Sequence, residues 1–248
     1  MSEQSEEGLP EVESSGGADY FPIWAHVLPF VAWLFIFQML GDPAGWKYAV
    51  RSVLCLGIFF YFRPWRWYAR LEVKNLPLAV GVGLAVFIVW IAGETAWMGQ
   101  WPMLQEWYMR IGFMPPWSLP ELDVEMARAA YAPDMVGWPL TAVRILGSAF
   151  VIGIIEEFFW RGFLYRWLLA KDFLSVDPGK LDLPMFLLVA LVFGVEHNRW
   201  LVGVLAGLAY GWMYLRTRDI WAVSIAHALT NLVLGIYVVW AEQWAFWS

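Results

Sequence analysis

The chain contains 248 residues, of which 60% are hydrophobic and only 15% are charged. A soluble domain of this length carries many more charged residues, so this composition excludes an ordinary water-soluble protein. The formal net charge of −6 arises at the N-terminus, because residues 1–19 contain six acidic residues and Lys47 is the first basic residue. The rest of the chain is close to neutral and has no basic patch or nucleotide-binding glycine loop, so we expect no nucleic-acid partner.

Residues 1–19 form the first predicted unit. This segment is rich in Ser, Gly and Glu and lacks a basic region followed by an apolar core, which predicts an acidic disordered tail and not a cleaved signal peptide. Residues 20–248 are expected to form a single transmembrane domain. The one cysteine, Cys55, can form neither an intramolecular disulfide nor a cysteine metal cluster, and its apolar neighbours indicate an inert packing residue.

Seven apolar segments are predicted to cross a bilayer, whose core of about 30 Å requires roughly 20 apolar residues per helix. They are residues 21–40, 46–62, 77–97, 139–160, 183–197, 200–215 and 220–241. The stretch 98–137 has a broken pattern with several prolines, which favours a re-entrant or interfacial helix over an eighth crossing. The expected fold class is therefore all-α, a polytopic transmembrane helix bundle of seven spans, or eight if 98–137 also crosses.

The distribution of Lys and Arg predicts how the bundle is oriented. These residues concentrate after the second, fourth and sixth spans, whereas 98–137 is mainly acidic. Because basic connections face the cytoplasm, we expect these three connections and the N-terminus to be cytoplasmic. The compact size indicates a bacterial inner membrane. In the sixth span, Gly203, Gly207 and Gly211 recur every four residues, a spacing expected to serve close helix packing within the bundle.

Ionisable groups inside a bilayer cost several kcal/mol unless they are paired or hydrated, so each marks a candidate functional site. Polar residues of this kind gather in three of the predicted spans. The fourth span contains Glu156, Glu157 and Arg161, the fifth ends with Glu196 and His197, and the seventh contains His227, Thr230 and Asn231. A lone Glu–Arg pair in a bundle is more often a packing contact than a catalyst, but packing does not require polar chemistry from three helices. By contrast, His26 is interpreted as structural and Glu94, alone in its span, as interfacial.

Helical spacing assigns different tasks to the two glutamates. Adjacent residues point about 100° apart, so Glu156 and Glu157 are not expected to serve one point on one face. Glu157 and Arg161 are four apart and are expected to form an ion pair. This leaves Glu156 facing a cavity as a candidate base. His227 and Asn231 also share a helix face, where an imidazole and a carboxamide can form an oxyanion hole.

These motifs resemble those of the CPBP or ABI family of intramembrane proteases, which includes the type II CAAX prenyl endopeptidases and bacterial CAAX protease-related proteins. The resemblance rests on Glu-Glu-x-x-x-Arg at 156–161, Phe-x-x-x-His at 193–197 and His-x-x-x-Asn at 227–231. It covers the expected protease-like core, residues 139–240.

The resemblance implies that Glu156 and His197 hold and activate a water, that His227 and Asn231 stabilise the oxyanion, and that Glu157 and Arg161 support the site. Phe193 belongs to the same support. Two His and one Glu could ligate zinc, but the sequence has no HExxH helix, so we expect no metal and no other cofactor. Glu196 either orients the site or marks the membrane surface.

The expected activity is an intramembrane endopeptidase acting on a peptide or membrane protein within the lipid bilayer. One alternative is a non-enzymatic immunity or partner-binding protein of the same family, which measured activity would exclude. A second is a proton-coupled transporter with a buried Glu–His relay. Against it, the polar residues gather in the later spans and no inverted repeat with paired broken helices is visible.

Overall fold

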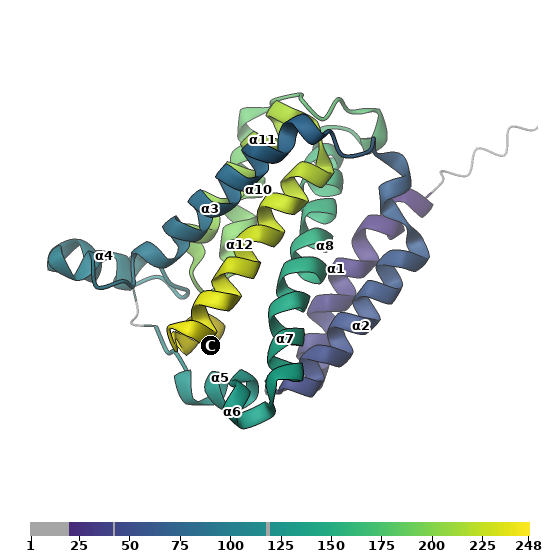
Figure 1. Ribbon diagram of the computed structural model, residues 1–248. Helices are drawn as coiled ribbons and strands as arrows, with labels where there is room; N and C mark the ends of the chain where they lie inside the picture. The colour runs from purple at the N-terminus through teal and green to yellow at the C-terminus, as the bar shows by residue number, and fades with distance from the viewer. Residues whose placement is uncertain (1–19, 42, 118–119) are drawn as a thin grey trace, which may run out of the picture.

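The computed structural model describes residues 20–41, 43–117 and 120–248, and every regular element in these ranges is a helix (Figure 1). The tail predicted at 1–19 lies outside the described residues. Helices occupy all seven ranges predicted as spans, and the fourth extends further than expected. They are α1 (Phe21–Leu40), α2 (Gly45–Phe62), α3 (Leu76–Ala92), the long helix Trp138–Leu169, α10 (Leu183–Val195), α11 (Trp200–Thr217) and α12 (Ile220–Trp240).

The long helix is divided by two π-helical segments, in which the turns are wider than in an α-helix. In chain order it consists of α7 (Trp138–Gly147), the π segment Ser148–Ile152, α8 (Gly153–Glu157), the π segment Phe158–Leu164, and α9 (Tyr165–Leu169). The glutamate pair therefore lies in a short α-helical stretch between two wide-turn segments.

Short helices connect the long ones. They are α4 (Pro102–Ile111), α5 (Val124–Tyr131), α6 (Pro133–Val136) and the 3-10 turns Pro64–Trp67, Val73–Asn75, Met98–Gln100, Phe173–Ser175 and Trp244–Trp247. Within the described part of 98–137 the longest helix, α4, has ten residues, too few to cross a bilayer. Figure 1 shows α4 projecting sideways from the bundle, while α5 and α6 lie at one end of it.

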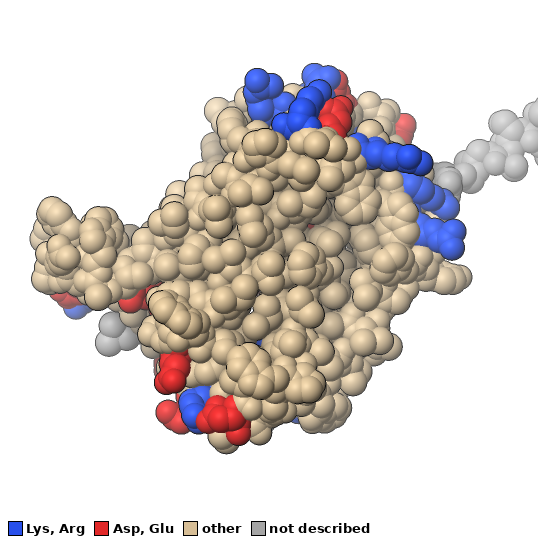
Figure 2. Space-filling model, in the orientation of Figure 1, with Lys and Arg blue, Asp and Glu red and all other residues tan. Residues whose placement is uncertain are grey.

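The surface identifies an integral membrane protein. Among the described residues, four helices are long and apolar enough to cross a membrane: Phe21–Leu40, Val73–Ala92, Trp138–Leu169 and Ile220–Trp240. Large apolar side chains are exposed along the helices, Phe35, Val53 and Ile88 among them. Figure 2 shows a broad band without charged side chains between two charged ends. A soluble monomer rarely exposes so continuous an apolar surface.

Asp219 fixes where α3 and α12 begin. One oxygen of its carboxylate accepts hydrogen bonds from the backbone N–H groups of Trp221 and Ala222 and so caps α12. The other oxygen accepts from the backbone N–H of Glu72 and the amide of Asn75, just before α3. Capping of this kind satisfies N–H groups that have no partner within the helix. The two helices consequently start together and pack along their length.

The glycine stripe of α11 packs against α10, as predicted. A Cβ at Gly203 would lie 3.0 Å from the Gly194 backbone, and one at Gly207 would lie 3.0 Å from the carbonyl oxygen of Ala190. Gly211 also faces a side chain of α10. The stripe thus serves helix packing inside the bundle.

The structure adds detail to three sequence interpretations outside the polar cluster. Cys55 is fully buried. His26 is also buried, and its ring nitrogens bond to the Pro22 carbonyl and the Tyr68 hydroxyl at 2.6 and 2.9 Å. Glu94 lies just beyond the end of α3, and both its oxygens accept from Arg199, at 2.6 and 2.7 Å. Its partner is distant in sequence, so no local spacing indicated the pair.

Candidate active site

His227, on α12, lies between the two adjacent glutamates of the long helix. Its Nδ1–H donates to Oε1 of Glu157 at 2.8 Å, and its Nε2 lies 3.7 Å from Oε2 of Glu156. Because a carboxylate accepts and cannot donate, this contact assigns the ring proton to Nδ1. The two glutamates make different contacts, as expected, but they are not directed to separate places. They face opposite nitrogens of one imidazole.

The predicted ion pair between Glu157 and Arg161 is present and fully enclosed. Nη1 of Arg161 donates to Oε1 of Glu157 at 3.1 Å, and Nη2 donates to the carbonyl oxygen of Gly207, also at 3.1 Å. Glu157 is 0% and Arg161 2% exposed. The guanidinium lies 4.5 Å from the ring centre of Phe193. Glu157 therefore binds Arg161 and His227 at once and holds both in position.

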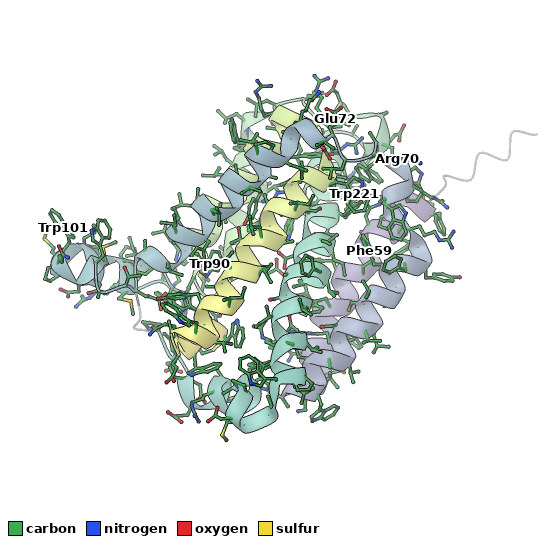
Figure 3. All side chains as sticks on the ribbon, viewed as in Figure 1. Phe59, Arg70, Glu72, Trp90, Trp101 and Trp221 are labelled. Carbon is green, nitrogen blue, oxygen red and sulfur yellow. The ribbon has the colours of Figure 1, made fainter. Side chains whose placement is uncertain are left out.

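His197 follows the C-terminal end of α10 and is held through its Nδ1. That nitrogen donates to the carbonyl oxygen of Phe193 at 2.9 Å. The ring also contacts Trp90 of α3 edge to face, with 5.4 Å between ring centres, and Figure 3 labels Trp90 along that helix. With the proton on Nδ1, Nε2 carries a lone pair that is available to a ligand.

Asn231 shares a helix face with His227, but its amide group already has a protein partner. Nδ2 donates to the backbone carbonyl of Ser148 at 2.9 Å. This carbonyl lies at the start of a π segment and also accepts the N–H of Gly153. An amide nitrogen has two donors, so one N–H of Asn231 is left for a ligand.

One cavity of about 240 Å³ is lined by Glu156, His197, His227 and Asn231. Oε2 of Glu156 is buried and has no hydrogen-bond partner among the described protein groups. The four residues predicted to be catalytic thus border the same space, although they come from the long helix, the end of α10, and α12. Glu196, next to His197, is exposed.

Two polar residues that the sequence prediction did not assign to the site, Tyr210 and Thr230, help to position His227. The ring of Tyr210 stacks on the imidazole with 4.8 Å between centres. Its hydroxyl donates to Thr230 at 2.7 Å, and Thr230 donates to the carbonyl oxygen of Gly83 at 2.8 Å. Thr230 was visible as a polar residue beside His227 in an apolar span. Tyr210 gave no comparable signal because tyrosine is common in such helices.

Residues 138–233 match the model of a known protein family, described as type II CAAX prenyl endopeptidase Rce1-like. This segment is Rce1-like. The family resemblance stated from the three motifs is thereby confirmed, and the family indicates a protease. Neither the search of curated proteins nor the search of solved structures found a match.

The Rce1-like segment does not enclose the cavity alone. Trp33 of α1, Tyr48 and Arg51 of α2 and Trp90 of α3 also line it, and all four lie outside the matched residues. The first three helices, which lie outside the matched segment, therefore supply one wall. A protein reduced to the Rce1-like segment would lack that wall.

The donor set of the Rce1-like segment does not fit a metal site. In the described part of the chain, no three His, Cys, Asp or Glu side chains are grouped so as to hold a metal ion. Nδ1 of His227 is bonded to Glu157 and Nδ1 of His197 to a backbone carbonyl. Metal independence of the protein stays a prediction.

Proposed function

We propose that this protein is an intramembrane endopeptidase that hydrolyses a peptide bond of a membrane-associated or lipidated substrate. The observation that carries the proposal is the single cavity shared by Glu156, His197, His227 and Asn231. Oε2 of Glu156, which has no hydrogen-bond partner among the described residues, borders that cavity together with two imidazoles. Since an unpaired polar group is costly inside a bilayer, its retention there favours a chemical role.

In the proposed reaction, a water is held between Glu156 and Nε2 of His197. Glu156 takes a proton from the water, whose oxygen attacks the carbonyl carbon of the substrate. The oxyanion that forms accepts hydrogen bonds from the free N–H of Asn231 and from His227 when its Nε2 is protonated. Glu157, bonded to Nδ1, would stabilise that imidazolium. The carbon–nitrogen bond then breaks as Glu156 returns the proton to the leaving amine.

The test compares membrane fractions from cells that express the wild type or Glu156→Gln. New peptide termini should appear with the wild type and be absent with Glu156→Gln, because an amide cannot accept the proton. Glu125→Gln is the matched control, since this glutamate is exposed on α5, and it should behave as the wild type. Equal cleavage by Glu156→Gln and the wild type would refute the assignment.

Metal independence is tested on purified protein. A catalytic zinc takes three protein ligands and a water, which here would consume Glu156, His197 and His227 and leave only Glu157, already bonded to Arg161. We therefore expect well under one equivalent of zinc by elemental analysis and retained activity after prolonged chelation. Stoichiometric zinc, with activity lost on chelation and restored by metal, would contradict the proposed roles.

A further inference from the structure

Two arginines, Arg51 and Arg144, line the same cavity, and neither has a carboxylate partner among the residues that the structure describes. Arg51 of α2 is only 9% exposed, and its guanidinium lies 3.9 Å from the Trp33 ring centre and 4.9 Å from that of Tyr48. Arg144 of α7 lies 4.5 Å from the same Tyr48 ring and donates to its hydroxyl at 3.3 Å. Its Nε is buried and has no hydrogen-bond partner among the described residues. Within the described residues, neither arginine has an ion pair.

Among the described residues, the buried arginines other than Arg51 are neutralised by a carboxylate or bonded to several backbone carbonyl oxygens. Arg161 and Arg199 bind carboxylates, and Arg166 donates to backbone carbonyl oxygens such as those of Val176 and Leu174. Aromatic rings attract a cation, but they recover only part of the cost of removing it from water. Arg51 and Arg144 therefore differ from these arginines, and a negatively charged ligand would neutralise their guanidinium groups.

The pair lies at a defined distance from Glu156. Arg51 and Arg144 are each the seventh residue of their helix, so both lie about 9 Å from its start at 1.5 Å per residue. Arg144, Ser148, Ile152 and Glu156 line the cavity at intervals of four residues. Twelve residues of α-helix span about 18 Å, which sets an upper bound because π turns are shorter. An extended peptide covers this distance in about five residues.

We propose that Arg51 and Arg144 form a subsite that binds a carboxylate of the peptide substrate, about five residues from the bond that is cut. This proposal rests on the proposed function. Guanidinium groups match a carboxylate in both geometry and charge. The carboxylate is either the C-terminus of the substrate or an Asp or Glu side chain, and the rings of Trp33, Tyr48 and Trp247 would pack on the neighbouring apolar groups.

The kinetic test uses one internally quenched apolar peptide in three forms: a free C-terminal carboxylate, a C-terminal amide, and the amide with an Asp at varied positions. The wild type should show a KM at least about tenfold lower for the carboxylate than for the plain amide, the advantage expected of a charged hydrogen bond. Arg51→Gln and Arg144→Gln should each raise the KM for the carboxylate peptide to the KM for the plain amide, with a smaller effect on kcat. If an added Asp lowers the KM of the amide peptide to that of the carboxylate peptide, the subsite binds a side-chain carboxylate. If no Asp position lowers it, the subsite binds the C-terminus.

Arg70→Gln is the matched control, because Arg70 is exposed at the opposite end of the bundle (Figure 3). It should retain the preference for the carboxylate. Equal KM values for carboxylate and amide in the wild type, or an unchanged preference in both arginine variants, would overturn the subsite.

A binding measurement separates this proposal from the proposed function. If the wild type cleaves none of the peptides, endopeptidase activity on them fails, and the labelled carboxylate and amide peptides are titrated onto Glu156→Gln. The carboxylate should bind about tenfold more tightly, and adding Arg51→Gln should remove the difference. Equal binding of both peptides, or binding of neither, counts against the subsite whatever the catalytic result.

Discussion

Arg161 and Arg51 are both buried, but among the described residues only Arg161 of the two neutralises a carboxylate. Replacing it with Gln leaves Glu157 with His227 as its remaining partner. Removal of one member of a buried pair typically costs about 3–5 kcal/mol. We therefore expect Arg161→Gln to lower the thermal unfolding temperature in detergent strongly, and Arg51→Gln to leave it unchanged or raise it, because no negative charge is orphaned. Equal losses would mean that Arg51 has a structural role.

Asn231 is predicted to act on the transition state. Asn231→Ala should reduce kcat by about 10²–10³, the effect typical of one lost oxyanion donor, with little change in KM. The variant also deprives the Ser148 carbonyl of a hydrogen bond. Ser148→Ala is the matched control, since it keeps that carbonyl and should retain kcat. A large rise in KM at unchanged kcat would assign Asn231 to substrate binding instead.

Sequence spacing could predict contacts within one helix but not between helices. Glu157 and Arg161 are four residues apart, so their ion pair followed from helical geometry. The pair of Glu94 with Arg199 joins residues 105 apart, and the stacking of Tyr210 on His227 joins two helices. No local pattern encodes such contacts. The ionisable residues Arg51 and Arg144 did give a signal, as charges within predicted spans, although the family motifs did not include them.

At the scale of the elements, the helices were predicted more accurately than their internal geometry. Apolar segments marked all seven long helices because a bilayer imposes both length and composition. The two π segments around Glu156 and Glu157 were not foreseen, since their residues are as apolar as those of an α-helix. They flank the glutamate pair, and single π turns inside α-helices are frequent at functional sites.

The projecting helix α4 is predicted to lie in the membrane interface. Trp101, Leu104 and Trp107 are 59%, 54% and 55% exposed, and Figure 3 shows Trp101 far from the bundle. Exposed aromatic and apolar groups on a short amphipathic helix favour the interface between headgroups and acyl chains. A spin label at Leu104→Cys should lie within about 10 Å of the headgroup level by power-saturation EPR in liposomes.

The matched control for α4 is Ile88→Cys, which is exposed within α3. Its label should lie deeper, in the hydrocarbon core, because α3 belongs to a candidate membrane span. A label at Leu104→Cys as accessible to water-soluble relaxants as a fully solvated loop would show that α4 extends away from the membrane.

The whole molecule has two ends that differ in charge. Figure 2 shows most Lys and Arg side chains at one end of the apolar band, and acidic side chains with fewer basic ones at the other. The sequence predicted this asymmetry from the connections alone, because charged residues are excluded from the band and must gather at its borders. It could not predict that α1 to α3 complete the cavity, since that depends on how the helices pack together.

We predict that the basic end faces the cytoplasm, following the rule that Lys and Arg connections remain inside. Lys74 lies at that end, and Met135, which is 54% exposed, lies in α6 at the other end beside the start of α7. In intact cells a membrane-impermeant maleimide should label Met135→Cys but reach Lys74→Cys only after permeabilisation, and the buried Cys55 should not react in either case. The reverse labelling pattern would show that the basic end of the bundle faces away from the cytoplasm. Arg51 and Arg144 lie at the end nearer Met135, so the expected result would also direct the carboxylate end of the substrate away from the cytoplasm.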